Sequence, residues 1–400
     1  MALGPGDPSA LAVALLVGDR SHLSEGGEEA LRQAGGSGGR AGVVLGNLSF
    51  PTVGATRFAE RTWLDAQGHL LGGRAADVAG VPRPTSADRF MSGLPVDLLC
   101  QALELSGGGF GLDAACASSL FAIKYACDRL HDRSADVMLA GAVNRADDLF
   151  IHVGFCALSA MSRTGRSRPF HAQADGLVPG EGCAIVALKR LADAERDNDR
   201  IFGVIRGVGL SNDGRGKGFL APSVDGQARA IRSAYEQAGL SPADVTLVEC
   251  HATGTPLGDA TEVRSMSRVY EGLSDVPMAS LKSNLGHLIT AAGTAGLIKV
   301  LCAMEAGVRA PTVGCDEPAP VLADSPFRLL QQQTTDVNLV QSALGGIQIH
   351  NGGDLPESTI EALHQALTGN GYDQQDGGCG TYQADRDVLP FRANPNDPFG

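Results

Sequence analysis

Several features that mark other classes of protein are scarce in this chain of 400 residues. Aromatic residues make up 5% and charged residues 19% of it, and the formal net charge is −13 with the basic residues scattered. This distribution argues against binding to nucleic acid or anionic lipid. The nine cysteines have no regular spacing, which indicates reduced thiols and a cytoplasmic location. Residues 9–18 are apolar but too short to span a bilayer, and we expect no membrane-spanning segment.

Glycine and apolar residues are abundant instead. The 53 glycines and 43% hydrophobic content suit a large core with close packing of helices on sheets. A helix is predicted over 225–238, ended by Gly239. Apolar strands, separated by helical patterns, are predicted at 41–46, 136–143, 183–188, 201–210, 245–250 and 278–281. The chain is therefore predicted to be an α/β protein.

Cys116 lies where an apolar strand stops among small residues and a helix begins. Leu120, Ile123, Cys127 and Leu130 fall on one face of that helix, so Cys116 is at or just before its amino terminus. Unpaired N–H groups and the helix dipole favour a thiolate there. Most cysteines are buried and inert instead, and we expect this of Cys100, Cys127, Cys156, Cys183, Cys250 and Cys302.

Two histidines occupy similar junctions. His251 ends the strand 245–250, and His287 follows a strand and a glycine turn that lead into a long helix ending near Gly307. The carboxyl ends of strands in open α/β sheets converge on one crevice, so we expect Cys116, His251 and His287 to meet.

The combination of two imidazoles with one thiol indicates a particular reaction. A cysteine hydrolase needs one imidazole base and an Asn or Asp that orients it. Two neutral imidazoles suit the enolate that forms when a malonyl thioester loses carbon dioxide, because both can donate hydrogen bonds to its oxygen. The carbanion would attack an acyl group held on the cysteine. This reaction requires no metal, flavin or nicotinamide.

At these residues the chain resembles the β-ketoacyl synthases of fatty acid and polyketide synthesis. The resemblance runs from about Ala41 to about Leu330 and is strongest to type I polyketide synthases and polyunsaturated fatty acid synthases. It implies a thiolase-like α/β fold with two similar halves, layered as α-β-α-β-α around mixed, mostly parallel sheets. The motifs that carry it are DAACASS at 113–119, GRSRPF at 165–170, DGLVPGEG at 175–182, HATGTPLGD at 251–259 and KSNLGH at 282–287.

The resemblance also implies roles for individual residues. Cys116 would accept the acyl group, and His251 and His287 would form the decarboxylation pair. Lys282 would order the site through Glu262, and Thr253 and Thr255 would bind the phosphopantetheine arm of an acyl carrier protein. No cofactor or metal would be bound to the protein itself.

The resemblance implies partners as well. We expect a homodimer formed through an edge strand in the sparsely charged region 108–143, and neighbouring synthase domains are further expected partners. An acyl carrier protein is usually acidic and would need a local basic patch. The candidates are Arg163, Arg166, Arg168, Arg215 and Lys217, which are as readily interpreted as solvated loop charges or structural ion pairs.

The domain boundaries expected from this organisation are 1–200 for the half with the cysteine and 201–352 for the half with the histidines. Residues 353–400, rich in Gly, Gln, Asp and Pro, are expected to be a disordered tail.

Both ends of the chain depart from the family pattern. Residues 11–17 are interpreted as a helix, so the strand that normally precedes it would be missing. Residues 342–351 lack the Gly-Phe-Gly-Gly turn that completes the oxyanion hole, and one lost donor typically costs about a hundredfold or more in rate. Two alternatives to a condensing enzyme stay open: an impaired ketosynthase that acts only as a dimerisation partner, and a cysteine-dependent acyltransferase or thioesterase. The intact Cys116, His251, His287 and Lys282 favour condensation.

Overall fold

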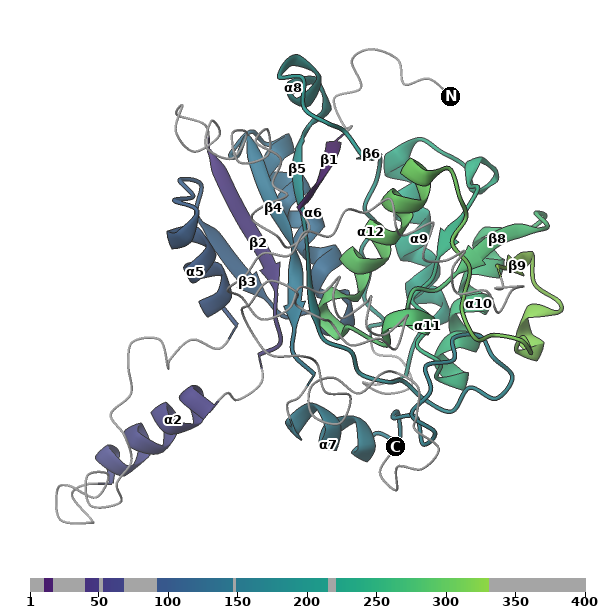
Figure 1. The fold of residues 1–400 in the computed structure, drawn as a ribbon, viewed down its shortest axis with the longest axis horizontal. Coiled ribbons are helices and arrows are strands. Elements are labelled where there is room, and N and C mark those ends of the chain that lie inside the picture. Colours follow the sequence, from purple (N-terminus) through teal and green to yellow (C-terminus); the bar gives the residue numbers. More distant parts are fainter. Residues whose placement is uncertain are drawn as a thin grey trace, which may run out of the picture.

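The computed structural model describes residues 11–16, 40–49, 53–67, 92–146, 149–214 and 221–330, which form two sheets with helices between and around them (Figure 1). The strands are β1 (Leu11–Leu16), β2 (Ala41–Gly46), β3 (Gly109–Leu112), β4 (Val137–Asn144), β5 (Gly182–Arg190), β6 (Gly203–Ile205), β7 (Val248–Glu249), β8 (Val276–Ala279) and β9 (Phe327–Leu329). The helices are α2 (Val53–Ala66), α5 (Leu94–Ala102), α6 (Ser118–His131), α7 (Leu149–Ala157), α8 (Leu191–Arg196), α9 (Val224–Ala238), α10 (Pro256–Val269), α11 (Lys282–Leu285) and α12 (Ala292–Ala306).

The first sheet has the strand order β3-β2-β4-β5-β1-β6. Strands β3, β2 and β4 are parallel, whereas β5 is antiparallel to both β4 and β1. Along β2 the side chains alternate between two cores: Val43 and Leu45 pack with Val96 of α5, and Val44 packs with Ile123 of α6. Burial on both faces explains why β2 is apolar at every position and not at alternate ones.

The helix predicted for residues 11–17 is wrong, because Leu11–Leu16 forms strand β1. It pairs with β5 in antiparallel register, with Leu11 opposite Arg190 and Leu16 opposite Ile185. A short run of apolar residues fits a buried strand as well as a helix, and periodicity alone cannot separate them. The strand that we expected to be missing is therefore present, between β5 and β6.

The second sheet is parallel, in the order β7-β8-β9. Two predicted strands are shorter than expected: 201–210 pairs only over Gly203–Ile205, which is β6 at an edge of the first sheet, and 245–250 pairs only over Val248–Glu249. After β6 the chain leaves the first sheet and packs against α9. A Cβ atom on Gly209 would approach the carbonyl oxygen of Ala230 to 1.9 Å, so glycine permits this contact with the helix backbone.

The helix predicted at 225–238 is confirmed as α9, which Ser223 caps and Gly239 ends at φ 62°. Helix α12 ends at Gly307 with φ 65°, also as predicted. Both glycines adopt the left-handed conformation that closes a helix with little strain.

Helix α12 joins the layers of the fold. Its Leu301 lies in the same core as Ile123 of α6 and Val186 of β5, and its other side contacts β7. Figure 1 shows α12 between the first sheet and the group formed by α9, α10, β8 and β9. The stretch Ile289–Ala306 is long and apolar enough to cross a membrane, but this central position accounts for its apolar composition.

The α/β class and the layering of helices on both faces of the first sheet are those that the resemblance implied. The division near residue 200 stays a prediction. Several predictions concern residues outside those that the structure describes: the basic residues Arg215 and Lys217, the segment 342–352 and the tail 353–400.

Candidate active site

Cys116 lies in a tight turn between β3 and α6. The turn is a 3-10 helix, Ala115–Ala117, in which Ala115 has a left-handed φ of 49°. Asp113 accepts a hydrogen bond from the Ala115 N–H at 2.9 Å, and Ser118 Oγ donates to the Ala115 carbonyl at 2.7 Å. These bonds hold a strained residue next to the cysteine, which fixes where Sγ points.

The structure brings the three predicted residues together. Nε2 of His287 lies 3.0 Å from Sγ of Cys116, and the His251 and His287 rings are 5.3 Å apart at an interplanar angle of 84°. Sγ and one nitrogen from each ring all lie within 4.8 Å of one another. Each residue comes from a different strand-to-helix junction, as the convergence of carboxyl strand ends requires.

Both imidazoles are held neutral. Burial, with the nearby Lys282 ammonium, lowers the pKa of His251 to about 3. Burial, followed by His251 and Lys282, lowers the pKa of His287 well below its usual range. By surface area His251 is exposed whereas His287 is 1% exposed, so a substrate can reach His251 from solvent while His287 is enclosed by the protein. A neutral imidazole keeps one N–H that can donate a hydrogen bond to an enolate oxygen, and it is a much weaker acid than an imidazolium, so it does not readily protonate the enolate.

The thiol of Cys116 differs from the sequence-based expectation. The helix end was expected to favour the thiolate, but burial is the largest influence and raises the pKa of Cys116, although Lys282 and the backbone of Cys116 act to lower it. Desolvation penalises the charged form more than these groups support it. The thiol therefore depends on a neighbour when it reacts, and His287 is the imidazole at hydrogen-bond distance.

His287 is held by a loop whose role the sequence did not reveal. Its N–H donates to the Val178 carbonyl at 2.7 Å, and its carbonyl accepts from the Gly180 N–H at 2.9 Å. A Cβ atom on Gly180 would lie 2.4 Å from the Leu285 carbonyl oxygen, so only glycine fits. The motif at 175–182 thus clamps the backbone of His287. Among the described residues, Nδ1 of His287 has no hydrogen-bond partner.

Two carboxylates of α10 support the loop that carries His251. Glu262 accepts the N–H groups of His251 and Ala252, each at 2.7 Å. Asp259 accepts the N–H groups of Phe170, Thr253 and Gly254 at 2.8 to 3.2 Å. Burial raises the pKa of Asp259 to about 7 even though these three donors favour its charged form.

Lys282 is buried, with 6% of its surface exposed, and lies at the start of α11. Burial lowers its pKa, while the charges of Glu262 and Glu249 favour the ammonium. The predicted link from Lys282 to Glu262 is therefore one of charge. Its role in ordering the site stays a prediction.

Thr253 and Thr255 lie just beyond His251, with their hydroxyl oxygens 3.0 Å apart. Thr253 is 8% exposed and Thr255 precedes the first turn of α10. The structure thus places both next to the catalytic candidates. Their binding to a phosphopantetheine arm stays a prediction.

The basic loop 163–168 lies against the same site. Ser167 Oγ donates to the Lys282 carbonyl, and a Cβ atom on Gly254 would lie 3.3 Å from the Arg168 backbone. Arg163 and Arg166 are exposed and form no ion pair within the described residues. The interpretation of these two as structural ion pairs is therefore not supported.

Four of the six cysteines expected to be buried are not. Cys156 on α7 and Cys183 on β5 are exposed, and Cys100 and Cys302 are partly exposed, whereas Cys127 and Cys250 are buried as expected. An apolar pattern does not show which face of an element is covered by another. The eight cysteines in the described residues form no disulfide with one another.

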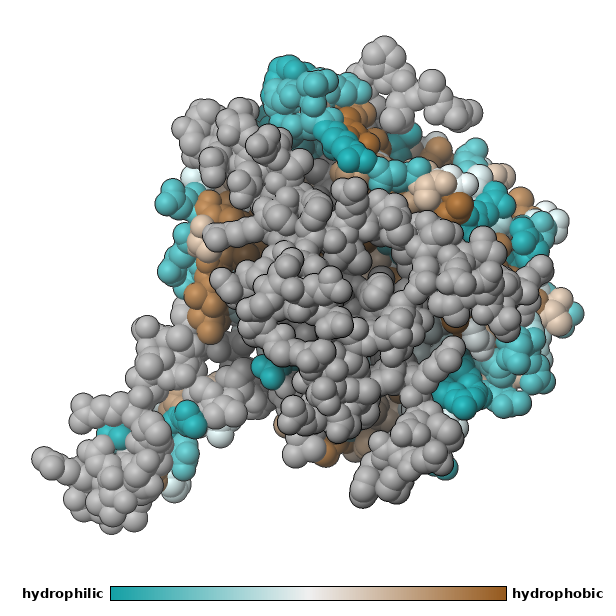
Figure 2. Space-filling view, in the orientation of Figure 1, coloured by the Kyte–Doolittle hydropathy of each residue, from teal (hydrophilic) through white to brown (hydrophobic). Residues whose placement is uncertain are grey.

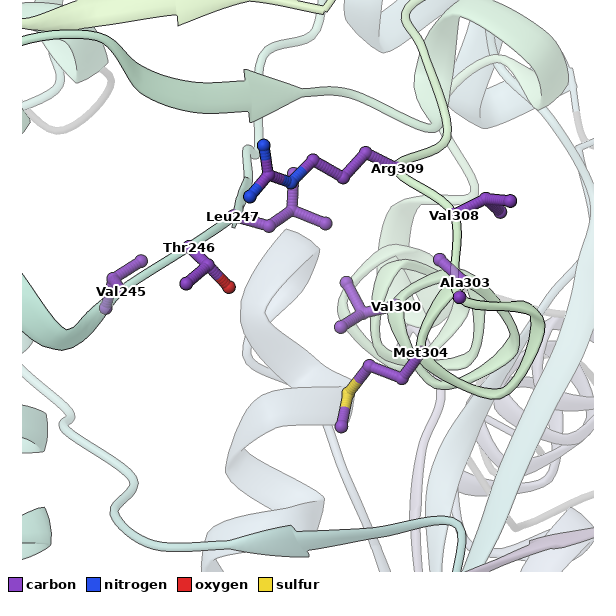
Figure 3. A pocket seen from close by; sticks show the side chains of 9 residues that line it. Val245, Thr246, Leu247, Val300, Ala303, Met304, Val308 and Arg309 are labelled. Carbon is purple, nitrogen blue, oxygen red and sulfur yellow. The ribbon is translucent and has the colours of Figure 1, made fainter. Parts of the chain in front are cut away.

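A pocket elsewhere on the surface contains none of the catalytic candidates (Figure 3). It is lined by Val245 and Leu247, which precede β7, and by Val300 and Met304 on the last turns of α12. The catalytic candidates lie at the opposite ends of these elements, since His251 follows β7 and His287 precedes α12. This pocket is therefore not part of the catalytic site.

Comparison with known proteins agrees with this geometry. Residues 23–194 match the family model described as beta-ketoacyl synthase, N-terminal domain, and residues 202–316 match the corresponding C-terminal domain. The chain belongs to the β-ketoacyl synthase family. Both models together include Cys116, His251, His287 and Lys282.

Solved ketosynthases share the fold. The oxazolomycin ketosynthase domain OzmH KS7 of Streptomyces albus JA3453 has a TM-score of 0.64 and 32% identity, covering 76% of this chain and 49% of that one. The PfaC ketosynthase–chain length factor has a TM-score of 0.62 and 40% identity, covering 70% of this chain and 31% of that one.

Curated relatives of this β-ketoacyl synthase chain are large synthases. A phenolphthiocerol/phthiocerol polyketide synthase of Mycobacterium tuberculosis is 42% identical over 240 residues, 58% of this chain and 13% of the relative. A polyunsaturated fatty acid synthase of a Thraustochytrium species is 38% identical over 288 residues, 69% of this chain and 14% of the relative. The matched part is thus a small fraction of either synthase.

Proposed function

We propose that this chain catalyses the decarboxylative Claisen condensation of an acyl group on Cys116 with a malonyl-type thioester on an acyl carrier protein, in polyketide or fatty acid biosynthesis. The observation that carries the proposal is the cluster of one thiol and two neutral imidazoles within 4.8 Å. Such a cluster combines a nucleophile with two donors for an enolate oxygen.

The reaction has two stages. In the first, Sγ of Cys116 attacks an acyl thioester and the carrier thiol leaves with the proton of Cys116. In the second, the malonyl thioester loses carbon dioxide, and N–H groups of His251 and His287 stabilise the enolate oxygen. The enolate carbon then attacks the acyl carbonyl, the carbon–sulfur bond breaks, and the thiolate of Cys116 takes up a proton as the β-ketoacyl carrier departs.

The carrier arm arrives as part of the substrate, so this proposal needs no resident cofactor. Thr253 and Thr255 are assigned to hold the arm because they follow His251 in the same loop. Arg163, Arg166 and Arg168 are assigned to the acidic carrier itself, since their loop contacts the backbone of Lys282 through Ser167. We retain a cytoplasmic location as part of the proposal.

The alternatives are less well supported. A thioesterase or acyltransferase of the hydrolase type would need a group that orients the imidazole, and Nδ1 of His287 has no such partner in the described part of the chain. The impaired ketosynthase rested partly on a missing strand, and β1 occupies that position.

Acylation tests the nucleophile directly. An acyl thioester should label Cys116 alone, because only this thiol has an imidazole nitrogen at hydrogen-bond distance in the described structure. Peptide mapping by mass spectrometry would locate the adduct. Exposed Cys156 provides the control, since Cys156→Ser should leave labelling unchanged while Cys116→Ser should abolish it. Adducts spread over several cysteines, or absent from Cys116, would contradict the assignment.

The edge of the first sheet is suited to the proposed homodimer. Strand β3 is one of the two edge strands of this sheet, and Phe110 on it is 42% exposed. The Phe110 ring packs 5.8 Å from Tyr125 of α6, which is 44% exposed, and Leu98 of α5 is 56% exposed. Figure 2 shows hydrophobic surface at the left, where α5 lies in Figure 1. An unpaired strand edge beside apolar side chains is suited to a second copy of the chain.

The chain should therefore be a dimer at micromolar concentration by light scattering. The double variant Phe110→Asp, Tyr125→Arg should be a monomer, because it places charges at the centre of the apolar surface. As a control, Met304→Arg changes an exposed apolar residue of α12 and should leave the dimer intact. A monomeric parent chain would contradict this prediction.

A further inference from the structure

Glu249 and Lys299 form a largely buried ion pair that is not part of the sequence-predicted site. Glu249 ends β7 two residues before His251, and Lys299 lies on α12. Oε2 of Glu249 lies 2.7 Å from Nζ of Lys299, and the two side chains are 12% and 9% exposed. A charged residue near the end of an apolar strand was the sequence signal that could have identified it.

The second oxygen of Glu249 holds the turn that carries Lys282. Oε1 accepts the N–H of Leu281 at 2.5 Å, and Leu281 directly precedes Lys282 and α11. One carboxylate therefore joins the strand that leads to His251, the turn that leads to His287 and the helix that follows it.

The packing of α12 leaves room for this carboxylate. Gly296 lies three residues before Lys299, and a Cβ atom there would come 3.2 Å from Cγ of Glu249. That contact is tighter than most Cβ contacts, so a larger residue would push the carboxylate away from Leu281. Gly296 and Lys299 thus provide both the space and the counter-charge for Glu249.

A buried ion pair is an inefficient way to stabilise a fold. Apolar residues of similar shape are often as stabilising, because the pair must be desolvated. The distinct contribution of Glu249 and Lys299 is geometric: they connect three segments, each of which ends near a catalytic candidate.

We infer that Glu249 and Lys299 are positioning residues for the condensation, which fix the 281–287 turn, and with it Lys282 and His287, relative to His251. The inference rests on the proposed function. It assigns neither residue a contact with substrate.

Three variants test the inference. Glu249→Gln and Lys299→Met each remove one charge and leave the other without its partner, so each should lower the kcat of malonyl decarboxylation at least tenfold. Acylation of Cys116 should fall with it, because both steps use His287. The double variant Glu249→Gln, Lys299→Met is neutral, and its amide oxygen can still accept the Leu281 N–H. It should recover most of the decarboxylation rate. Glu305 lies on α12 like Lys299 and forms an exposed ion pair with Arg200, which is outside this helix. Glu305→Gln should change neither rate.

Hydrogen exchange supplies a readout that does not need activity. In the single variants the peptide 281–287 should exchange faster, while peptides from β4 and β5 keep their protection. Unchanged exchange of 281–287, or a stable double variant without decarboxylation, would each overturn the inference. If the parent chain itself did not decarboxylate malonyl thioesters, the proposed function would fail while the exchange result still judged the positioning role.

Discussion

Alanine in place of either His251 or His287 should slow decarboxylation of a malonyl thioester by about 100- to 1,000-fold, the cost of losing one donor to a developing oxyanion. Both imidazoles are held in the neutral form, and their rings lie 5.3 Å apart. Release of labelled carbon dioxide from a malonyl-carrier substrate would measure the rate. Rates close to those of the parent chain in either variant would refute the assignment of the pair.

The same two variants should differ in acylation of Cys116. His287 lies 3.0 Å from Sγ, and burial raises the pKa of the thiol, so acylation depends on this imidazole. His287→Ala should therefore slow acylation by at least about 100-fold, whereas His251→Ala should leave it largely intact. Intact-protein mass spectrometry would follow the acyl adduct. Equal loss of acylation in both variants would favour an acyltransferase over a condensing enzyme.

Acidic buffer provides an independent check on the same pair. Because the pKa values of both imidazoles are lowered, to about 3 for His251, neither gains a proton as the pH falls through the usual range of histidine. The decarboxylation rate of pre-acylated protein should be level between about pH 5 and pH 8. Burial raises the pKa of Asp259 to about 7, so Asp259→Asn is the control. A fall centred near the ordinary pKa of histidine that persists in this variant would show that at least one ring is solvated.

Glu262→Gln should have the second largest effect, because it damages both stability and geometry. The carboxylate accepts two backbone N–H groups, from His251 and Ala252. A glutamine side chain has one oxygen and one NH₂ group, so one of these backbone donors would face another donor. We expect a loss of about 1–3 kcal/mol in the free energy of unfolding, together with at least tenfold slower decarboxylation. Denaturant unfolding and carbon dioxide release would measure the two effects.

Asp259→Asn is the matched control for that variant. Asp259 lies on the same helix and also accepts backbone N–H groups, but from Phe170, Thr253 and Gly254. Asparagine should cost a similar amount of stability, about 1–3 kcal/mol, with a smaller effect on decarboxylation because the His251 N–H keeps its acceptor. If both variants lost decarboxylation equally, the effect of Glu262→Gln would be one of general stability.

The local sequence was sufficient to identify the catalytic candidates. Cys116, His251 and His287 each follow an apolar strand, and the topology of a parallel sheet brings such positions to one edge. The carboxyl ends of α9 and α12 were predicted correctly as well, because each helix is closed by a glycine in the left-handed conformation, which is a local requirement. These features depend on a few neighbouring residues, so the sequence alone determined them.

Tertiary structure decided what depends on contacts between distant segments. Strand β1 was mistaken for a helix because only its pairing with β5 distinguishes the two. The raised pKa of the Cys116 thiol follows from burial by other parts of the chain, which outweighs the local effect of the helix end. Glu249 and Lys299 are 50 residues apart, and the clamp on His287 comes from Val178 and Gly180. Desolvation and long-range hydrogen bonds exist only after the chain has folded, so a local pattern can point to a residue such as Glu249 but not to its partner.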